Sequence, residues 1–211
     1  MAPLRRTLDA SSIMNLAGTT LVREFPDAPE TLEAKVQEQA RIAKASIHLP
    51  EDYRSDRTFP LLVFLNGGAG GDGGNPGEAR RITGSKGVVC ANFPLFKSRL
   101  AKATKESPRY WSRMYLRDVD AAAMWRGYAP MFAWLEGLVP NLDPARRGFG
   151  GFSNGAHTAV ALLNRRNRDL LDHVTHILLI EGGRDLRPGR HLKDLPILLL
   201  QGKKWDQPWL E

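Results

Sequence analysis

Residues 151 to 155 read Gly151-Phe152-Ser153-Asn154-Gly155, a G-x-S-x-G pattern that is followed by a helix-like run of small and apolar residues. The pattern is typical of a serine on a sharp turn between a strand and a helix, because a side chain two residues away on either side would collide with the other arm of the turn. Such a turn exposes the hydroxyl and directs helix N–H groups at the group that it attacks. Two simpler interpretations remain open: a serine is also a good helix N-cap, and the pattern can arise by chance among 20 glycines.

Short continuous apolar runs recur along the chain and indicate strands that are buried on both faces of a parallel sheet. The clearest lie at residues 61–65, 87–91, 177–180 and 195–200. A further strand is predicted over 43–49, and helical spacing predicts helices over 29–41 and 130–138. Alternating strands and helices predict an α/β fold, with a doubly wound, mainly parallel sheet and helices on both faces. We expect a single domain over 1–211, in which residues 1–28 match no pattern.

The composition is that of an ordinary globular domain, with 42% hydrophobic and 25% charged residues. The net charge of +7 is scattered rather than gathered in one stripe with interleaved aromatic residues, which argues against nucleic-acid binding. No apolar run approaches the ~20 residues that span a membrane, and residues 1–22 lack the apolar core of a signal peptide. Cys90 is the only cysteine, so no internal disulfide is possible and an oxidising compartment is not indicated. From the signal-peptide, apolar-run and charge patterns we expect a cytoplasmic protein with no membrane or nucleic-acid partner.

A glycine-rich loop, residues 66–77, follows the first of the apolar runs. Gly68, Gly70 and Gly73 formally match the G-x-G-x-x-G dinucleotide fingerprint, but the loop runs on to Pro76 instead of opening straight into a helix, and no acid ends the next strand. A second interpretation is an oxyanion loop, whose bare backbone N–H groups face a developing negative charge. The third is an ordinary surface loop, so the glycines alone leave the function open.

Acidic residues follow two of the predicted strands at their carboxyl ends, where ligands bind in open α/β sheets. Asp206 comes shortly after the run that ends at Leu200, which is where a carboxylate that orients a catalytic imidazole belongs. Glu181 and Asp185, which follow the preceding run, are the weaker candidates for the same role. A surface aspartate without a catalytic role is the simpler interpretation of Asp206.

Two further segments carry a resemblance to a known family: Leu49-Pro50-Glu51-Asp52-Tyr53, and Pro60-Leu61-Leu62-Val63-Phe64-Leu65-Asn66-Gly67-Gly68. Together with the serine pattern they resemble the α/β-hydrolase fold, and most closely the small bacterial serine esterases of the feruloyl-esterase and depolymerase-like type. The resemblance covers residues 43–206. That family commonly carries LP-x-x-Y followed by PLLVFLHGGG, and Asn66 takes the position of its usual histidine.

The resemblance implies a role for each matching residue. Ser153 would be the nucleophile, and Asp206, which lies one residue later than the family usually places it, would be the acid. The N–H of Asn154 would be one oxyanion donor, and Gly68 or Ala69 would give the other. The resemblance also implies hydrolysis of carboxylic esters through an acyl-enzyme, with a small-molecule ester as substrate and no metal or organic cofactor.

The catalytic base is where the chain departs from that family, which carries a histidine after the last strand. No histidine follows Asp206, and the chain has five elsewhere: His48, His157, His173, His176 and His191. Since none of them is suitably placed, we expect an incomplete hydrolase that lacks the last strand and helix and hydrolyses esters poorly. The alternatives are a hydrolase-fold protein that binds without cleaving, and a nucleotide-binding module that uses the glycine loop.

Overall fold

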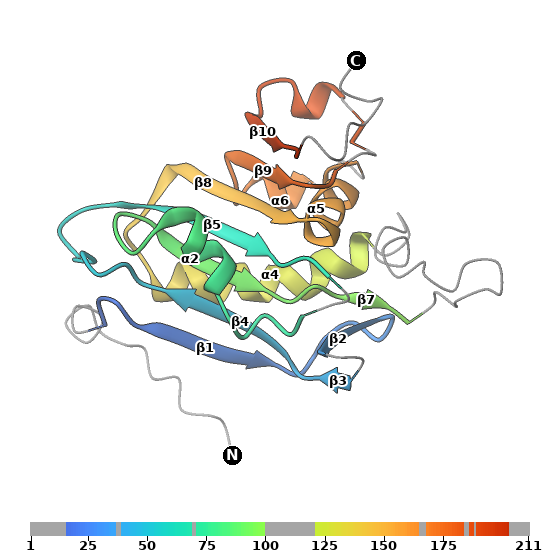
Figure 1. Ribbon diagram of the computed structural model, residues 1–211, viewed down its shortest axis with the longest axis horizontal. Coiled ribbons are helices and arrows are strands. Elements are labelled where there is room, and N and C mark those ends of the chain that lie inside the picture. The colour runs from blue at the N-terminus through green and yellow to red at the C-terminus, as the bar shows by residue number, and fades with distance from the viewer. Residues whose placement is uncertain are drawn as a thin grey trace.

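The main feature of the computed structural model is a seven-stranded sheet that runs from β1 at one edge to β10 at the other (Figure 1). In order across the sheet, the strands are β1 (Thr20–Phe25), β4 (Ala43–His48), β6 (Val89–Phe93), β5 (Phe59–Leu65), β8 (Leu142–Phe152), β9 (His176–Ile180) and β10 (Ile197–Leu200). A smaller sheet contains β3 (Gln39–Arg41), β2 (Leu32–Val36) and β7 (Lys97–Ser98). The structure describes residues 16–36, 39–68, 71–99, 121–164, 168–183, 186–187 and 189–202.

Five neighbouring strands are parallel to one another: β6, β5, β8, β9 and β10. Strand β4 is antiparallel to β6, and β1 is antiparallel to β4. The carboxyl ends of all the parallel strands therefore lie at the same edge of the sheet. This arrangement confirms the predicted mainly parallel sheet, and each apolar run singled out in the sequence contributes one of its strands. Side chains that follow β5, β8, β9 and β10 are brought together at that edge.

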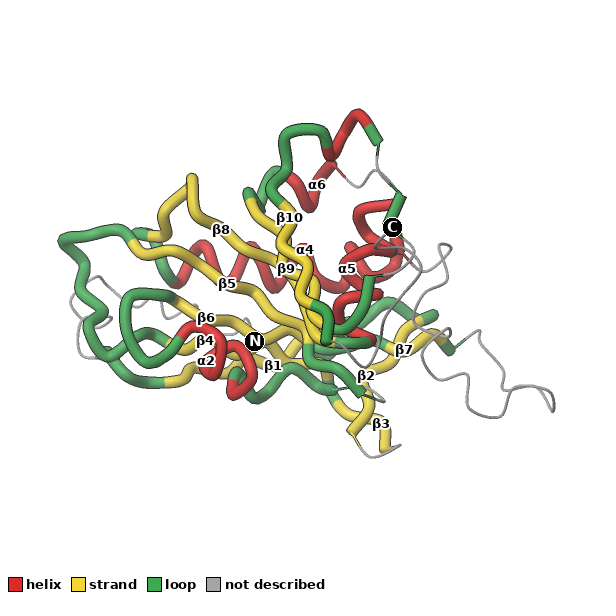
Figure 2. The backbone as a smooth tube through the Cα atoms, turned by 45° about the horizontal axis from the view of Figure 1, so that its top comes forward, coloured by secondary structure: helices red, strands yellow, loops and turns green. Residues whose placement is uncertain are grey.

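Helices cover both faces of the sheet (Figure 2). Leu61, Val63 and Leu65 of β5 belong to the large core, together with side chains of α4 (Ala121–Leu138) and α5 (Asn154–Asn164). Leu62 and Phe64 face the other way, toward α2 (Gly77–Thr83). Successive side chains of a strand point to opposite faces, so a strand that is covered on both sides must be apolar at every position. The remaining helical segments are short: α6 (Arg168–Leu171) and η2 (Arg190–Leu192).

The predicted helix over residues 29–41 is wrong, because this segment forms β2 and β3. Leu32 and Ala34 are buried and the residues between and after them are only half-buried, which is the two-residue period of a strand. Leucine and valine four residues apart fit both periods, and the strand is stabilised here by pairing with β7. The unassigned segment 1–28 contains β1, which pairs with β4 over its whole length.

Exposed leucines lie on β10, at the edge of the sheet. Leu198 and Leu200 are 57% and 45% exposed, and β10 pairs only with β9 in the part of the chain that the structure describes. A strand with one unpaired edge and exposed apolar side chains is a template for pairing between molecules. No helix in the described segments is long and apolar enough to span a bilayer.

The Leu198→Lys variant is expected to reduce concentration-dependent light scattering and to leave the melting temperature nearly unchanged. Lysine on an edge strand opposes pairing between molecules, and a substitution at an exposed position changes stability by only about ±0.5 kcal/mol. The matched control is Leu199→Lys, whose side chain faces the large core and should lower the melting temperature. Scattering that is the same for Leu198→Lys and the unmodified protein would exclude this edge as the aggregating surface.

Candidate active site

The structure places Ser153 where the G-x-S-x-G pattern predicts it: Ser153 is the single residue between a strand and a helix. β8 ends at Phe152, α5 begins at Asn154, and Ser153 has a φ angle of +52°. Its N–H donates to the carbonyl oxygen of Ile180 at 2.8 Å, and its own carbonyl accepts the N–H of His157 at 3.1 Å. A non-glycine residue with positive φ is uncommon and is retained only where the surroundings enforce it.

The two glycines of the pattern are required for different steric reasons. A Cβ atom on Gly151 would lie 2.5 Å from the carbonyl carbon of Gly155, on the other arm of the turn, as the sequence predicts. A Cβ atom on Gly155 would instead overlap the carbonyl oxygen of Leu65 and lie 2.9 Å from that of Asn66. The second glycine therefore lets α5 approach the end of β5, where the glycine-rich loop begins.

The glycine-rich loop is fastened to the Ser153 turn by a side chain. Asn154 is only 8% exposed, and its Nδ2 donates to the carbonyl oxygen of Gly68 at 2.7 Å. Gly68 has a φ of +85°, and a Cβ atom on Gly67 would lie 2.6 Å from Cδ1 of Phe152. The first residues of the loop are thus held against the residues on both sides of Ser153. Ala69, the other expected oxyanion residue, lies outside the described residues.

Positive electrostatic potential is directed at the same place. The first N–H groups of a helix lack intrahelical partners, and α5 carries no acid in its first turn to neutralise them. Neither Asn154 nor Gly68 donates its backbone N–H to an acceptor among the described residues. The hydroxyl of Ser153 likewise makes no hydrogen bond within the described segments. The Ser153 hydroxyl and the backbone N–H groups of Asn154 and Gly68 are therefore brought together by the fold.

The predicted acids are only partly visible at this edge. Asp206 and Asp185 lie outside the described residues. Glu181 follows β9 directly, but its carboxylate accepts the N–H of Gly202 at 2.6 Å and the Nε2 donor of Gln201 at 3.0 Å. Each of its oxygens therefore accepts one hydrogen bond from the end of β10, which holds the carboxylate against that strand.

Three of the histidines lie at the amino ends of the parallel strands, away from Ser153. His48 is buried beside Thr20, with 3.0 Å between its Nδ1 and the threonine Oγ1, and burial, aided by a nearby arginine, lowers the pKa of its imidazole. His173 and His176 lie before and at the start of β9, whose five residues separate them from the Ser153 edge by about 13 Å. None of these three side chains reaches the Ser153 hydroxyl.

The other two histidines lie on or beside α5. Nδ1 of His157 accepts the N–H of Gly183 at 3.3 Å, so in the neutral ring the proton is on Nε2 and the lone pair is already used. His191 binds the carbonyl oxygen of Leu163 at 2.9 Å, at the far end of the helix. Ten residues of helix separate Leu163 from Ser153, a distance of about 15 Å. The residues that the structure describes contain no group of three His, Cys, Asp or Glu side chains that could hold a metal.

Comparison with solved structures reveals the same architecture elsewhere. A dienelactone hydrolase-like promiscuous phosphotriesterase from metagenomic libraries matches 91% of this chain and 72% of its own length, with 14% identity and a TM-score of 0.50. The chain has the α/β-hydrolase fold. A thermostable esterase matches 89% of the chain with 17% identity and a TM-score of 0.48. Carboxyl esterase 2 from Tuber melanosporum matches 83% of the chain with 19% identity and a TM-score of 0.43. The chain spans only 46% and 49% of these two proteins.

No protein-family model matches the sequence, and no curated protein matches it significantly. The α/β-hydrolase fold is therefore recognised from the arrangement of the strands and not from overall sequence similarity. At 14% identity, the likeness to the phosphotriesterase establishes the fold alone.

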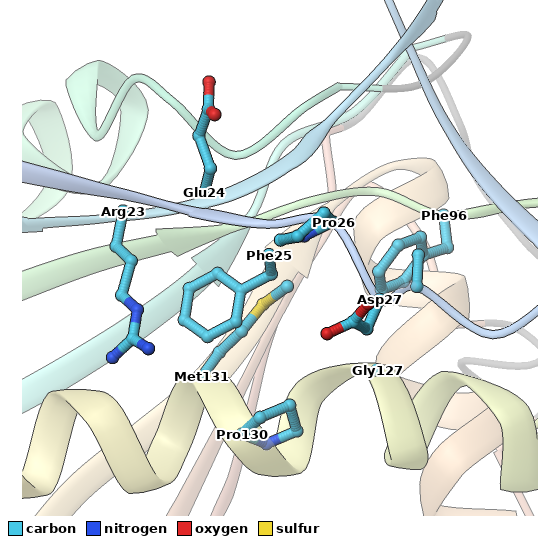
Figure 3. A pocket seen from close by; sticks show the side chains of 10 residues that line it. Arg23, Glu24, Phe25, Pro26, Asp27, Phe96, Gly127, Pro130 and Met131 are labelled. Carbon is cyan, nitrogen blue, oxygen red and sulfur yellow. The ribbon is translucent and has the colours of Figure 1, made fainter. Parts of the chain in front are cut away.

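A surface cavity of about 210 Å³ lies at the opposite edge of this hydrolase fold, between β1 and α4 (Figure 3). Phe25, Phe96 and Met131 form its apolar walls, and Arg23 and Asp27 lie at its rim. Four strand spacings separate β1 from β8, which is about 19 Å. Because its lining contains no serine, cysteine or histidine, this cavity is not the place at which Ser153 would act.

Sequence reasoning missed two contacts of the Ser153 turn. The sequence pattern assigns a role only to the backbone N–H of Asn154. Its side-chain amide also donates to the carbonyl oxygen of Gly68, a residue 86 positions away. A Cβ atom on Gly182 would lie 2.6 Å from the carbonyl oxygen of Ser153, so this glycine is also part of the turn's packing. A glycine directly after a strand-ending glutamate was the only sequence signal for the second contact.

Proposed function

We propose that the chain is a serine hydrolase that acts on small carboxylic esters through an acyl-enzyme formed at Ser153. The observation that carries the proposal is the placement of Ser153: a strand-to-helix turn with positive φ, a hydroxyl without a partner among the described residues, and a glycine loop fastened beside it. The fold alone does not dictate the reaction, so the proposal rests on this site.

The proposed reaction follows from the groups around the hydroxyl. The Ser153 Oγ attacks the carbonyl carbon of the ester, and the proton of the hydroxyl leaves to a base. The negative charge that develops on the carbonyl oxygen is stabilised by the N–H of Asn154 and by that of Gly68 or Ala69, at the positive end of α5. The alcohol departs, an acyl-enzyme remains on Ser153, and water releases the acid. Asp206 is the proposed acid of the site.

Removal of the Ser153 proton is expected to limit the rate, because none of the described histidines is placed to act as the base. The lone pair of His157 already accepts the N–H of Gly183, and the other histidines lie at the ends of strands or of α5 that are remote from Ser153. Water, or a residue outside those described, must therefore remove the proton. A serine without a base is a poor nucleophile, and we expect slow acylation supported mainly by the oxyanion donors and by binding.

The test is reaction of the 211-residue chain with a fluorophosphonate, followed by mass spectrometry of the peptide that carries Ser153. A stoichiometric adduct on Ser153, formed faster on folded than on denatured protein, is the expected result. Binding of p-nitrophenyl esters without adduct or release of p-nitrophenol would identify a hydrolase-fold protein that binds without cleaving.

The variants Asn154→Ala and Asn154→Asp are expected to slow fluorophosphonate labelling about tenfold, because complete loss of a placed oxyanion donor costs about 100- to 1000-fold and a donor loop that is no longer fastened loses part of that. Both variants keep the backbone N–H of residue 154 and lose only the amide that binds the Gly68 carbonyl. The measurement is the second-order labelling rate at a temperature well below unfolding.

The matched control is Asn75→Ala, which removes an exposed asparagine of the same loop whose Oδ1 accepts the N–H of Gly77. This control should label like the unmodified protein. If Asn154→Ala labels equally fast while its melting temperature falls, the side chain serves stability and does not hold the oxyanion loop.

A further inference from the structure

Glu181 repeats the backbone geometry of Ser153 one strand further along the sheet. It is the other non-glycine residue with positive φ in the described part of the chain, at +51° against +52° for Ser153. Each residue follows its strand directly and donates its N–H to the last residue of the next strand: Ser153 to Ile180 at 2.8 Å, and Glu181 to Leu200 at 2.9 Å. The two turns therefore continue the ladders β8–β9 and β9–β10 by one residue each.

The side chain of Glu181 fastens the end of β10. One carboxylate oxygen, Oε1, accepts the N–H of Gly202 at 2.6 Å, and the other, Oε2, accepts the side-chain amide of Gln201 at 3.0 Å. Hydrogen bonds to an ionised carboxylate are stronger than those between neutral groups. A Cβ atom on Gly202 would lie 2.6 Å from Oε1, so a larger residue there would require the carboxylate to shift.

The residues after Glu181 connect this contact to the Ser153 turn. A Cβ atom on Gly182 would lie 2.6 Å from the carbonyl oxygen of Ser153 and 3.0 Å from Cβ of Ala156. Gly183 then donates its N–H to His157 of α5. Residues 181–183 thus pack on the Ser153 turn with their backbone, while the Glu181 carboxylate binds the end of β10. A displacement of either part is transmitted to the other through close backbone contacts.

We infer that Glu181 is a positioning residue for the reaction of Ser153. Its carboxylate binds Gln201 and Gly202, and residues 181–183 pack on the Ser153 turn, so Glu181 fixes the turn relative to the end of β10. The inference rests on the proposed function for its catalytic meaning. It assigns the carboxylate a different task from orienting an imidazole, because the contacts that it makes are with Gln201 and Gly202.

The first measurement is hydrogen exchange of the Gly202 amide, which does not depend on activity. We expect faster exchange in Glu181→Ala than in the unmodified protein and an intermediate rate in Glu181→Gln, whose amide oxygen can still accept the Gly202 N–H. Gly202→Ala should affect the same contact from the opposite side, and its effect should not add to that of Glu181→Ala. Exchange at Gly202 that is unchanged in Glu181→Ala overturns the contact and the inference.

The second measurement is the rate of fluorophosphonate labelling of Ser153 in the same variants, at a temperature where all are folded. A misplacement of catalytic groups by about 1 Å costs up to ~10²-fold, so we expect Glu181→Ala to label about tenfold more slowly and Glu181→Gln to recover part of the rate. The control is Asp172→Asn, at an exposed carboxylate beyond the amino end of β9, which should label normally.

The outcomes separate the two hypotheses. Faster exchange with an unchanged labelling rate overturns the positioning role and leaves Glu181 as a stabilising contact. Absence of Ser153-dependent labelling in the unmodified protein overturns the proposed function and with it the positioning role, and the exchange of Gly202 still decides whether the contact exists. Faster exchange together with slower labelling, partly rescued by glutamine, supports the inference.

Discussion

Fluorophosphonate labelling is expected to disappear in the Ser153→Ala variant. The rate of hydrolysis of short p-nitrophenyl esters is expected to fall by about 10³-fold, or to the uncatalysed background rate if that is reached first. The reason is chemical: the phosphorus or carbonyl carbon is attacked by the Ser153 oxygen, and alanine has no atom that can form the bond. The backbone contacts of the turn, the N–H to Ile180 and the carbonyl to His157, do not involve the lost hydroxyl. The variant should therefore stay folded.

The measurements are the labelling rate, the initial rate of p-nitrophenol release, and the thermal melting curve of each variant. Ser55→Ala, at an exposed serine in the turn before β5, is the matched control and should behave like the unmodified protein. Labelling of Ser153→Ala at the original rate would move the nucleophile to another residue. If neither protein labels and both are folded, Ser153 is not an activated nucleophile in this chain.

The Gly155→Ala variant is expected to lose about 3 kcal/mol or more of unfolding free energy, because overpacking commonly costs 1–3 kcal/mol and here the clash is with backbone atoms. The new Cβ atom would overlap the carbonyl oxygen of Leu65 and lie 2.7 Å from its carbonyl carbon, and neither atom can move without shifting β5. For a domain of this size, such a loss lowers the melting temperature by about 6–12 °C. Circular dichroism during heating measures the shift.

Gly137→Ala is the control for this second variant. Gly137 lies near the end of α4, and nothing stands within 4 Å of the position that its Cβ atom would take. Alanine in an exposed helix interior gains up to about 1 kcal/mol over glycine, so the melting temperature of the control should stay the same or rise. A Gly155→Ala variant as stable as Gly137→Ala would show that α5 can withdraw from β5, which contradicts the packing described above.

The features that could be predicted from the sequence are those determined by neighbouring residues. The Ser153 turn follows from two glycines within five positions, and the buried strands follow from uninterrupted apolar runs such as residues 61–65. Strands β1, β2 and β3 gave no comparable signal. β1 is mostly exposed and polar, and β2 has only two fully buried residues, so a helical period matched its sequence equally well.

Contacts between distant segments could not be predicted, because no local pattern encodes them. The amide of Asn154 finds Gly68 only after β5 and β8 have paired, and the carboxylate of Glu181 finds Gly202 only after β9 and β10 have paired. The positions of the histidines are the opposite case. The sequence predicts that none of them is suitably placed to act on Ser153, and the structure adds the hydrogen bonds that His157 and His191 make.

The dependence of the Ser153 turn on three strands has a kinetic consequence. Its φ of +52° is held by Ile180 of β9, by the end of β5 against Gly155, and by Gly68 through Asn154, a contact that spans 86 residues. Contacts between such distant residues require closure of long loops and form late in folding. A reactive Ser153 should therefore emerge only after helical circular dichroism has returned during refolding. Pulse labelling with a fluorophosphonate would then time the docking of β5, β8 and β9 as a single event.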